Sequence, residues 1–207
     1  MSNLKRIFIF ILIWLLSGRN RRRRLAKWRQ NGIPKTEAAF SNRKKFSAVI
    51  AEEILMRTFC FFLFVLWISF CFAKLEIAIE GGDGWAKNLP TWRLSGNHVL
   101  SRWLFGGREI TGYHAWVNLY NFSFAHMAYL FQPFCAATEM RILAFLLLVC
   151  VTEDFLWFIL NPVFGLRKFK KENIWWHKNN WWRFAPREYF MYVPVALMLY
   201  FGAMFLS

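Results

Sequence analysis

The chain has 207 residues, a formal charge of +15 and a hydrophobic share of 57%, with 24 Phe and 12 Trp. Ordinary soluble domains are only about 45–50% apolar, so the composition excludes that class. A soluble nucleic-acid binder would explain the charge but leaves the long apolar blocks unexplained. Apolar blocks separated by Lys and Arg are typical of helical membrane proteins, because a helix satisfies its own backbone groups in lipid. The sequence therefore predicts an all-α, multi-pass helical membrane bundle.

The N-terminal residues 1–18 contain an apolar run, Ile7 to Leu16, that is short for the roughly 20 residues needed to span a bilayer. Arginines follow where a signal peptide would carry a small-residue cleavage site, so we interpret 1–18 as an uncleaved anchor or interfacial helix. The segment 19–46 has eleven Lys or Arg. We expect it to be cytoplasmic and to contact anionic lipid headgroups.

Residues 47–207 are predicted to form the bundle, with about four main helices. Helix boundaries follow from capping residues and prolines: Thr138 is a candidate N-cap, and Asn161 with the next residue, a proline, ends the same helix. The predicted helices cover Ser47–Ala73, Tyr113–Phe131, Thr138–Leu160 and Tyr189–Leu206.

Two connecting regions are predicted to lie outside the membrane core. Residues 74–112 contain Gly and Pro turn signals and three tryptophans, which favours a loop region at the membrane interface. The connector 166–187 mixes Lys and Arg with four tryptophans and is typical of the lipid headgroup layer. Single-stranded nucleic acid could stack on the same residue types, but beside a membrane span the lipid interpretation is favoured. The charges leave open whether 113–131 crosses the membrane or lies on it.

Two adjacent acids, Glu153 and Asp154, lie in the middle of the most apolar predicted helix. One ionised acid at that depth costs about 2.5–3.5 kcal/mol on insertion scales, and such acids usually face a bundle interior or a polar cavity. Adjacent helical residues differ by about 100° in direction, so the two acids address different neighbours. They need partners, protons or a metal, and they are the main indication of function.

The other polar side chains of the apolar helices are few. His114, Asn118 and Asn121 fall on one face of the helix 113–131, whereas His126 points about 120° away from His114. Further supporting candidates are Asn161, which shares a helical face with Asp154, and His177, which could approach from the connector.

Carboxylates with imidazoles are suited to three kinds of chemistry. Glu153, Asp154, His114 and His126 could bind a divalent transition metal. Glu153, Asp154 and His114 could act as acid–base catalysts on a lipid-phase substrate. The same groups could relay protons. A fourth interpretation is structural, in which Glu153 bonds His114 or Asn118 and holds two helices together.

For function the sequence thus leads to a small integral membrane protein with a buried His/carboxylate cluster, expected to be a metal-dependent or acid–base enzyme. The alternatives are a non-catalytic subunit or assembly factor of a larger membrane complex, and proton or ion translocation. Expected partners are the lipid bilayer, anionic headgroups and other membrane proteins, with nucleic acid disfavoured. Basic residues and short loops favour the cytoplasmic membrane of a prokaryote.

Overall fold

The structure, a computed structural model, describes residues 37–206 and is mostly helical. The predicted anchor 1–18 and most of the basic segment 19–46 lie outside the described residues. The chain divides into two units, Met1–Thr58 and Phe59–Ser207. The bundle and the candidate site belong entirely to the second unit. The mostly helical structure confirms the predicted all-α class.

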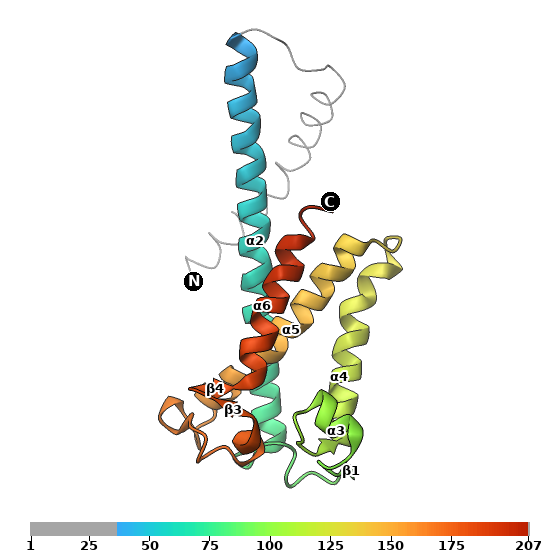
Figure 1. Cartoon of the computed structure of the whole chain (residues 1–207), viewed down its shortest axis with the longest axis vertical. Coiled ribbons are helices and arrows are strands. Elements are labelled where there is room, and N and C mark those ends of the chain that lie inside the picture. The colour runs from blue at the N-terminus through green and yellow to red at the C-terminus, as the bar shows by residue number, and fades with distance from the viewer. Residues whose placement is uncertain (1–36, 207) are drawn as a thin grey trace. The chain divides into compact units, whose positions relative to one another are not determined.

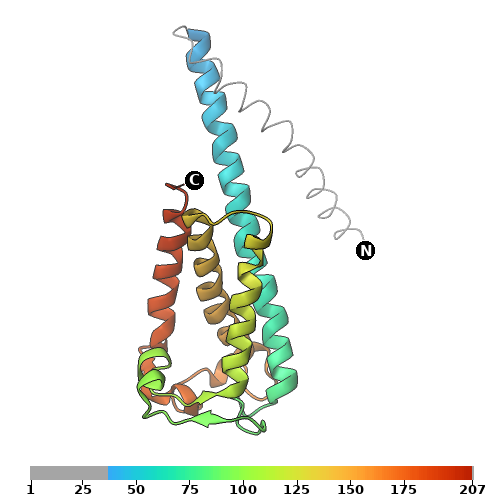
Figure 2. The ribbon, with the colours of Figure 1, turned by 90° about the vertical axis from the view of Figure 1, so that its right-hand side faces the viewer.

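Four helices lie side by side in the second unit (Figures 1 and 2). In sequence they are the C-terminal part of α2 (Glu37–Glu80), α4 (Gly112–Ala125), α5 (Ala136–Leu160) and α6 (Arg187–Gly202). Helices α2 and α5 run in one direction, and α4 and α6 run in the other. The short helix η1 (His126–Leu130) continues α4 toward the turn before α5.

Two of the described helices contain segments long and apolar enough to cross a membrane, Ser47–Glu80 and Ala136–Leu160. Helices α4 and α6, with 14 and 16 residues, are only about 21 and 24 Å long, short of a hydrocarbon core of about 30 Å. The second unit thus contains the four main helices predicted, but by length and composition only two of the described helices are candidate spans, so the multi-pass arrangement is not confirmed.

An apolar core joins α2, α5 and α6. Val65 of α2 packs with Ala144 and Leu148 of α5 and with Ala196 of α6. Both alanines are fully buried, and their small side chains let the helix backbones approach closely. The ring of Tyr200 closes this core.

Helix α2 continues past the predicted boundary at Ala73 and ends at Glu80. The added residues contain no Gly or Pro, so nothing interrupts the helix before Gly81. Gly81 has a positive φ of 70° and its N–H donates to the Ile77 carbonyl at 3.0 Å, as in a glycine-terminated helix. The predicted loop region 74–112 is thus helical in its first part, and this places two further acids of α2 at the site.

The rest of the first loop region contains short elements only. Strand β1 (Arg93–Leu94) pairs antiparallel with β2 (Ile110–Thr111), in the register Arg93 opposite Thr111. Helix α3 (Val99–Leu104) lies between the two strands along the chain. The hairpin ends at α4, and Thr111 caps that helix by accepting the His114 N–H at 3.2 Å.

The second connector follows α5 and is also irregular. It contains η2 (Leu166–Lys168), η3 (Trp175–Asn180) and the two-residue strands β3 (Trp181–Trp182) and β4 (Ala185–Pro186), which pair antiparallel. Both connectors lie at the same end of the bundle, at the bottom of Figures 1 and 2. Residues 81–111 and 161–187 together carry eleven Lys or Arg and three Asp or Glu.

The start of α5 differs from the prediction. Cys135 is the N-cap residue and α5 begins at Ala136, so Thr138 lies inside the first turn. The chain before it is irregular at Pro133, which has no N–H to donate, and the helix starts as soon as the proline constraint is past. Glu139 does lie in the first turn, where an acid favours the helix dipole.

A second core of aromatic residues attaches the connectors to the helices. Phe158 of α5 is fully buried and stacks on Trp176 of η3, with ring centroids 5.7 Å apart. Trp157 meets the same Trp176 ring edge to face at 5.7 Å. This core fixes the position of η3, which carries His177.

We expect Gly84→Ala to destabilise the protein more than Gly81→Ala. Both glycines have positive φ, 67° and 70°, so each alanine bears a similar backbone cost of about 1–2 kcal/mol. A Cβ at Gly81 meets open space, whereas a Cβ at Gly84 overlaps the buried Trp176 ring. Thermal unfolding of both variants measures the difference, and equal midpoints would contradict the packing of Trp176 on Gly84.

Candidate functional site

A cavity of about 390 Å³ lies within the second unit, between the four helices and the loop end. Its volume is within the range of about 300–1,000 Å³ usual for ligand sites. Among the described residues that line it, Arg108 is the single Lys or Arg. The carboxyl groups in its lining are those of Glu76, Glu80, Glu153, Asp154 and Glu188.

The cavity lining changes from ionisable to uncharged side chains along three helices, and to apolar ones along α2 and α5. On α2 the lining runs from Glu80 to Phe72, and on α5 from Asp154 to Leu146. On α4, which runs the opposite way, it extends from His114 to Phe122, with Asn118 and Asn121 keeping polar groups along this helix. Each pair is eight residues apart, which corresponds to about 12 Å of helix. The cavity is therefore amphipathic, with its polar end next to the loops.

Asp154 accepts two hydrogen bonds at the polar end. The Tyr189 hydroxyl of α6 donates to Oδ2 at 2.5 Å, and His177 Nε2 of η3 lies 3.4 Å from Oδ1. His177 is buried. The predicted approach of His177 from the connector is thus observed, and it gives Asp154 a partner that spacing along the helix could not reveal.

Arg108, in the loop between α3 and β2, extends the same network. Its guanidinium donates to Glu188 Oε1 at 2.7 Å and lies 3.4 Å from His177 Nδ1. It also lies over the Trp85 ring, 4.5 Å from the centroid, in a cation–π contact. His177 is therefore located between Asp154 and Arg108, with Glu188 balancing the guanidinium charge.

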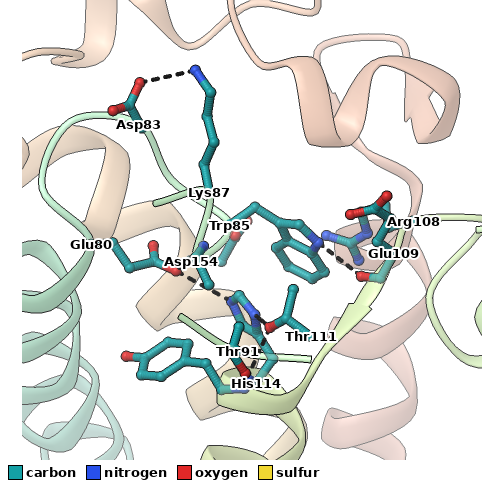
Figure 3. A network of polar contacts seen from close by, with 12 residues as sticks. Glu80, Asp83, Trp85, Lys87, Thr91, Arg108, Glu109, Thr111, His114 and Asp154 are labelled. Atoms are coloured by element: carbon teal, nitrogen blue, oxygen red, sulfur yellow. Dashed lines mark hydrogen bonds and ion pairs between the residues drawn. The ribbon is translucent and has the colours of Figure 1, made fainter. Parts of the chain in front are cut away.

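His114 forms a second polar group with the end of α2 (Figure 3). Its Nε2 lies 3.6 Å from Glu80 Oε1, and its Nδ1 is 2.6 Å from the Thr111 hydroxyl. The Ala86 N–H donates to the same Glu80 oxygen at 2.5 Å. The imidazole stacks on Trp85 with a centroid distance of 4.1 Å. Trp85 thus separates His114 from Arg108 and holds both in place.

Glu153 faces α2. Its carboxyl group lies close enough to that of Glu76 for the two acids to interact, and Glu76 also lies near the Tyr113 hydroxyl. A hydrogen bond between two carboxyl groups requires a proton on one of them. Glu153 and Asp154 therefore address different neighbours, as predicted: Glu153 lies next to Glu76 of α2, whereas Asp154 contacts His177 and Tyr189.

Two polar atoms on α5 are buried and have no hydrogen-bond partner among the described residues. They are Glu153 Oε1 and Trp157 Nε1, and both side chains line the cavity. They are four residues apart, so they lie on the same face of the helix, one turn from each other. The cavity wall on α5 therefore contains an unpaired acceptor and an unpaired donor on residues one helical turn apart.

The asparagines divide between two roles. Asn118 and Asn121 line the cavity on the same face as His114, as predicted, and the Asn118 amide donates to the His114 carbonyl at 2.7 Å. Asn161 is not in the cavity lining. Its amide donates to the Gly81 carbonyl at 2.8 Å and its oxygen accepts the Val163 N–H at 3.0 Å, so it joins the ends of α2 and α5.

His126 lies apart from the cavity. It is twelve residues after His114, about 18 Å further along the helix, and its Nε2 is 3.1 Å from Glu139 Oε1. The Phe122 carbonyl, with a smaller contribution from Glu139, raises the pKa of His126. Within residues 37–206 no group of three or more His, Cys, Asp or Glu could hold a metal ion. The structure thus does not support the metal centre predicted from Glu153, Asp154, His114 and His126.

Asp83 is an exposed acid near the site. It lies in the turn after α2, and its carboxylate accepts from Lys87 at 3.2 Å (Figure 3). It also accepts from Asn88 at 2.5 Å. These contacts hold the pKa of Asp83 below its ordinary value. Asp83 does not line the cavity.

Five residues of the site were not predicted from the sequence. Glu76 and Glu80 follow Phe72 at four-residue spacing, a helical pattern that could have indicated them. Arg108, Glu188 and Tyr189 come from a loop and from the start of α6, and no spacing in the chain connects them to Asp154.

Comparison of the chain with protein-family models, curated proteins and solved structures found no match.

Proposed function

We propose that the protein is a membrane-embedded acid–base enzyme acting on an amphiphilic substrate. The observation that carries this proposal is the amphipathic cavity, in which His177 is held by Asp154 at the polar end while the opposite end is apolar. A substrate with a polar head and a hydrocarbon tail matches both ends. No step in the proposal requires a metal.

A location in the membrane is supported by the outer faces of the helices. Large apolar side chains are more than half exposed on α2 (Phe59, Trp67), α4 (Trp116, Tyr120) and α6 (Met198). Only 11% of the most apolar window of Ser47–Glu80 is buried, unlike the core helix of a soluble protein. Contiguous apolar surface of this kind needs lipid or a partner to cover it. We propose a multi-pass bundle in a cytoplasmic membrane, with segment 19–46 on the cytoplasmic side.

His177 is the group best placed to move a proton. Asp154 orients its imidazole through Nε2, in the way that a carboxylate orients the histidine of a hydrolase triad. The Tyr189 hydroxyl holds the other oxygen of Asp154, so the carboxylate cannot rotate away. Arg108, 3.4 Å from His177 Nδ1, fixes the second nitrogen of the imidazole, and the guanidinium is itself held by Glu188.

We expect Asp154→Asn to lower turnover about 100- to 10,000-fold, the usual contribution of a general acid or base. His177→Gln should have a similar effect, and the double variant should be no slower than either, because the two side chains act as one unit. Purified protein in liposomes of a total lipid extract, followed by mass spectrometry of all lipids, identifies the species that the wild type converts.

The matched control is Asp83→Asn, which makes the same chemical change at an exposed acid outside the cavity. It should turn over at the wild-type rate. Circular dichroism and gel filtration check that all variants fold. The proposal is wrong if the wild type converts no lipid, or if folded Asp154→Asn and His177→Gln both retain full turnover.

A further inference from the structure

We infer that the head of the ligand is a protonated amino alcohol, whose ammonium group binds Glu153 and whose hydroxyl oxygen accepts from Trp157. This inference rests on the proposed function for the idea that the ligand is a substrate, but its binding test does not. The two protein atoms, Glu153 Oε1 and Trp157 Nε1, are buried in the cavity wall on α5 without hydrogen-bond partners among the described residues, and Glu188 Oε2 on α6 is a third such atom.

The charge of the cavity favours a cation. Its lining has five carboxyl groups and a single guanidinium, and Arg108 is already engaged by Glu188 and His177. Glu153 and Glu76 both line the cavity, and a single proton shared between their carboxyl groups would leave one negative charge on the pair. An ammonium group at Glu153 Oε1 would neutralise that charge where water is largely excluded. A fatty acid or a phosphate head would instead add to the negative charge.

The aromatic residues that line the cavity also favour a cationic ligand. Trp157, Trp176 and Trp85 line the polar end of the cavity. Indole faces attract cations, and the attraction strengthens when the cation is desolvated. Arg108 already uses the Trp85 face in this manner. The remaining rings thus provide a surface for a second, ligand-borne cation.

The requirement for a hydroxyl comes from Trp157. Indole Nε1–H can only donate, so its partner must be an acceptor, which an ammonium group is not. Glu153 Oε1 can only accept while the carboxyl group is ionised. The two atoms are one helical turn apart, so a head group that offers N–H donors and a hydroxyl oxygen on neighbouring carbons matches both. Its alkyl tail would follow the lining toward Phe72 and Leu146.

The test compares three probes on the full-length protein in detergent, with dissociation constants measured by native mass spectrometry. The probes are a single-chain 1,2-amino alcohol with a dodecyl tail, the matching diol, and the trimethylammonium form of the amino alcohol. The amino alcohol should bind about 10- to 100-fold more tightly than the diol, the range for a hydrogen bond to a charged group. The trimethylammonium form keeps the charge but cannot donate to Glu153, so it should bind more weakly than the amino alcohol.

Substitutions at Glu153 and Trp157 test whether the amino alcohol binds at these two side chains. Glu153→Gln should abolish the preference for the amino alcohol over the diol, whereas Glu172→Gln, at an exposed acid of the connector, should retain it. If Glu153→Gln does not fold, Trp157→Phe provides a second test. It removes the N–H donor together with one ring of the indole, and the amino alcohol should then bind no better than dodecylamine, a fourth probe that lacks the hydroxyl group. Equal binding of amino alcohol and diol to the wild type, or an unchanged preference in folded Glu153→Gln, would overturn the inference.

Failure of the inference and failure of the proposed function give different results. Asp154→Asn should keep the preference for the amino alcohol over the diol while turnover is lost, because Glu153 and Trp157 are unchanged. Binding of the amino alcohol without any turnover of a lipid extract would refute the enzyme and leave the ligand class standing. Turnover of a lipid without an amino group would refute the ligand class and leave the enzyme standing.

Discussion

Arg108→Gln is expected to lower the free energy of unfolding by about 3–5 kcal/mol, the usual cost of removing one partner from a buried ion pair. The side chains of Arg108 and Glu188 are only 13% and 14% exposed, and their charged atoms are 2.7 Å apart. Loss of the guanidinium leaves the Glu188 carboxylate uncompensated in a cavity already rich in acids. It also removes the cation from the face of Trp85. Denaturant titration in detergent measures the change.

A double-mutant cycle assigns this loss to the ion pair. Glu188→Gln removes the uncompensated charge, so Arg108→Gln/Glu188→Gln should be more stable than Arg108→Gln alone. The surface pair Lys87–Asp83, with side chains 55% and 48% exposed, is the control. Lys87→Gln should cost less than about 1 kcal/mol. Arg108→Gln with a cost no larger than that of Lys87→Gln would show that the buried pair does not stabilise the bundle.

Phe158→Ala is expected to cost about 3–5 kcal/mol, the range for deleting a buried aromatic ring. Phe158 is fully buried, stacks on Trp176 and contacts the ring of His177, with centroids 6.2 Å apart. Its loss opens a hole between α5 and η3, so His177 should lose its fixed position as well. The same denaturant titration gives the stability, and activity at low temperature reports the displacement of His177.

The control for this substitution is Phe134→Ala. Phe134 is 74% exposed in the turn before α5, so its deletion leaves no cavity. Phe158→Leu should fall between the wild type and Phe158→Ala, because it fills part of the space. If Phe158→Ala and Phe134→Ala had equal effects, the aromatic core would not be what positions η3.

The helical class and part of the site could be predicted from the sequence because they depend on local pattern. Glu153, Asp154 and the face of His114, Asn118 and Asn121 are fixed by helical periodicity, and these residues do line the cavity. The sequence pattern underestimates the length of α2. The apolar run stops at Lys74, seven positions before the first glycine, but the helix continues to Glu80.

The partners of the predicted acids could not be found in the same way. Arg108 and Glu188 are 80 residues apart, and His177 is 23 residues from Asp154. Such contacts depend on how two irregular connectors fold over one end of the bundle, and no local periodicity encodes that. His126 was grouped with the site by residue type alone, and its distance along the helix from His114 shows why type is insufficient.

Asn161 ties the last turn of α5 to the residue that follows α2. The two longest apolar helices of the described chain therefore end at a common level, and their register is set at that level. One residue inserted between Glu76 and Glu80, or between Asp154 and Asn161, would rotate an acid of the cavity by about 100° relative to the opposite helix. A change in the length of α2 or α5 at its other end, far from the cavity, would leave this register and the site unchanged.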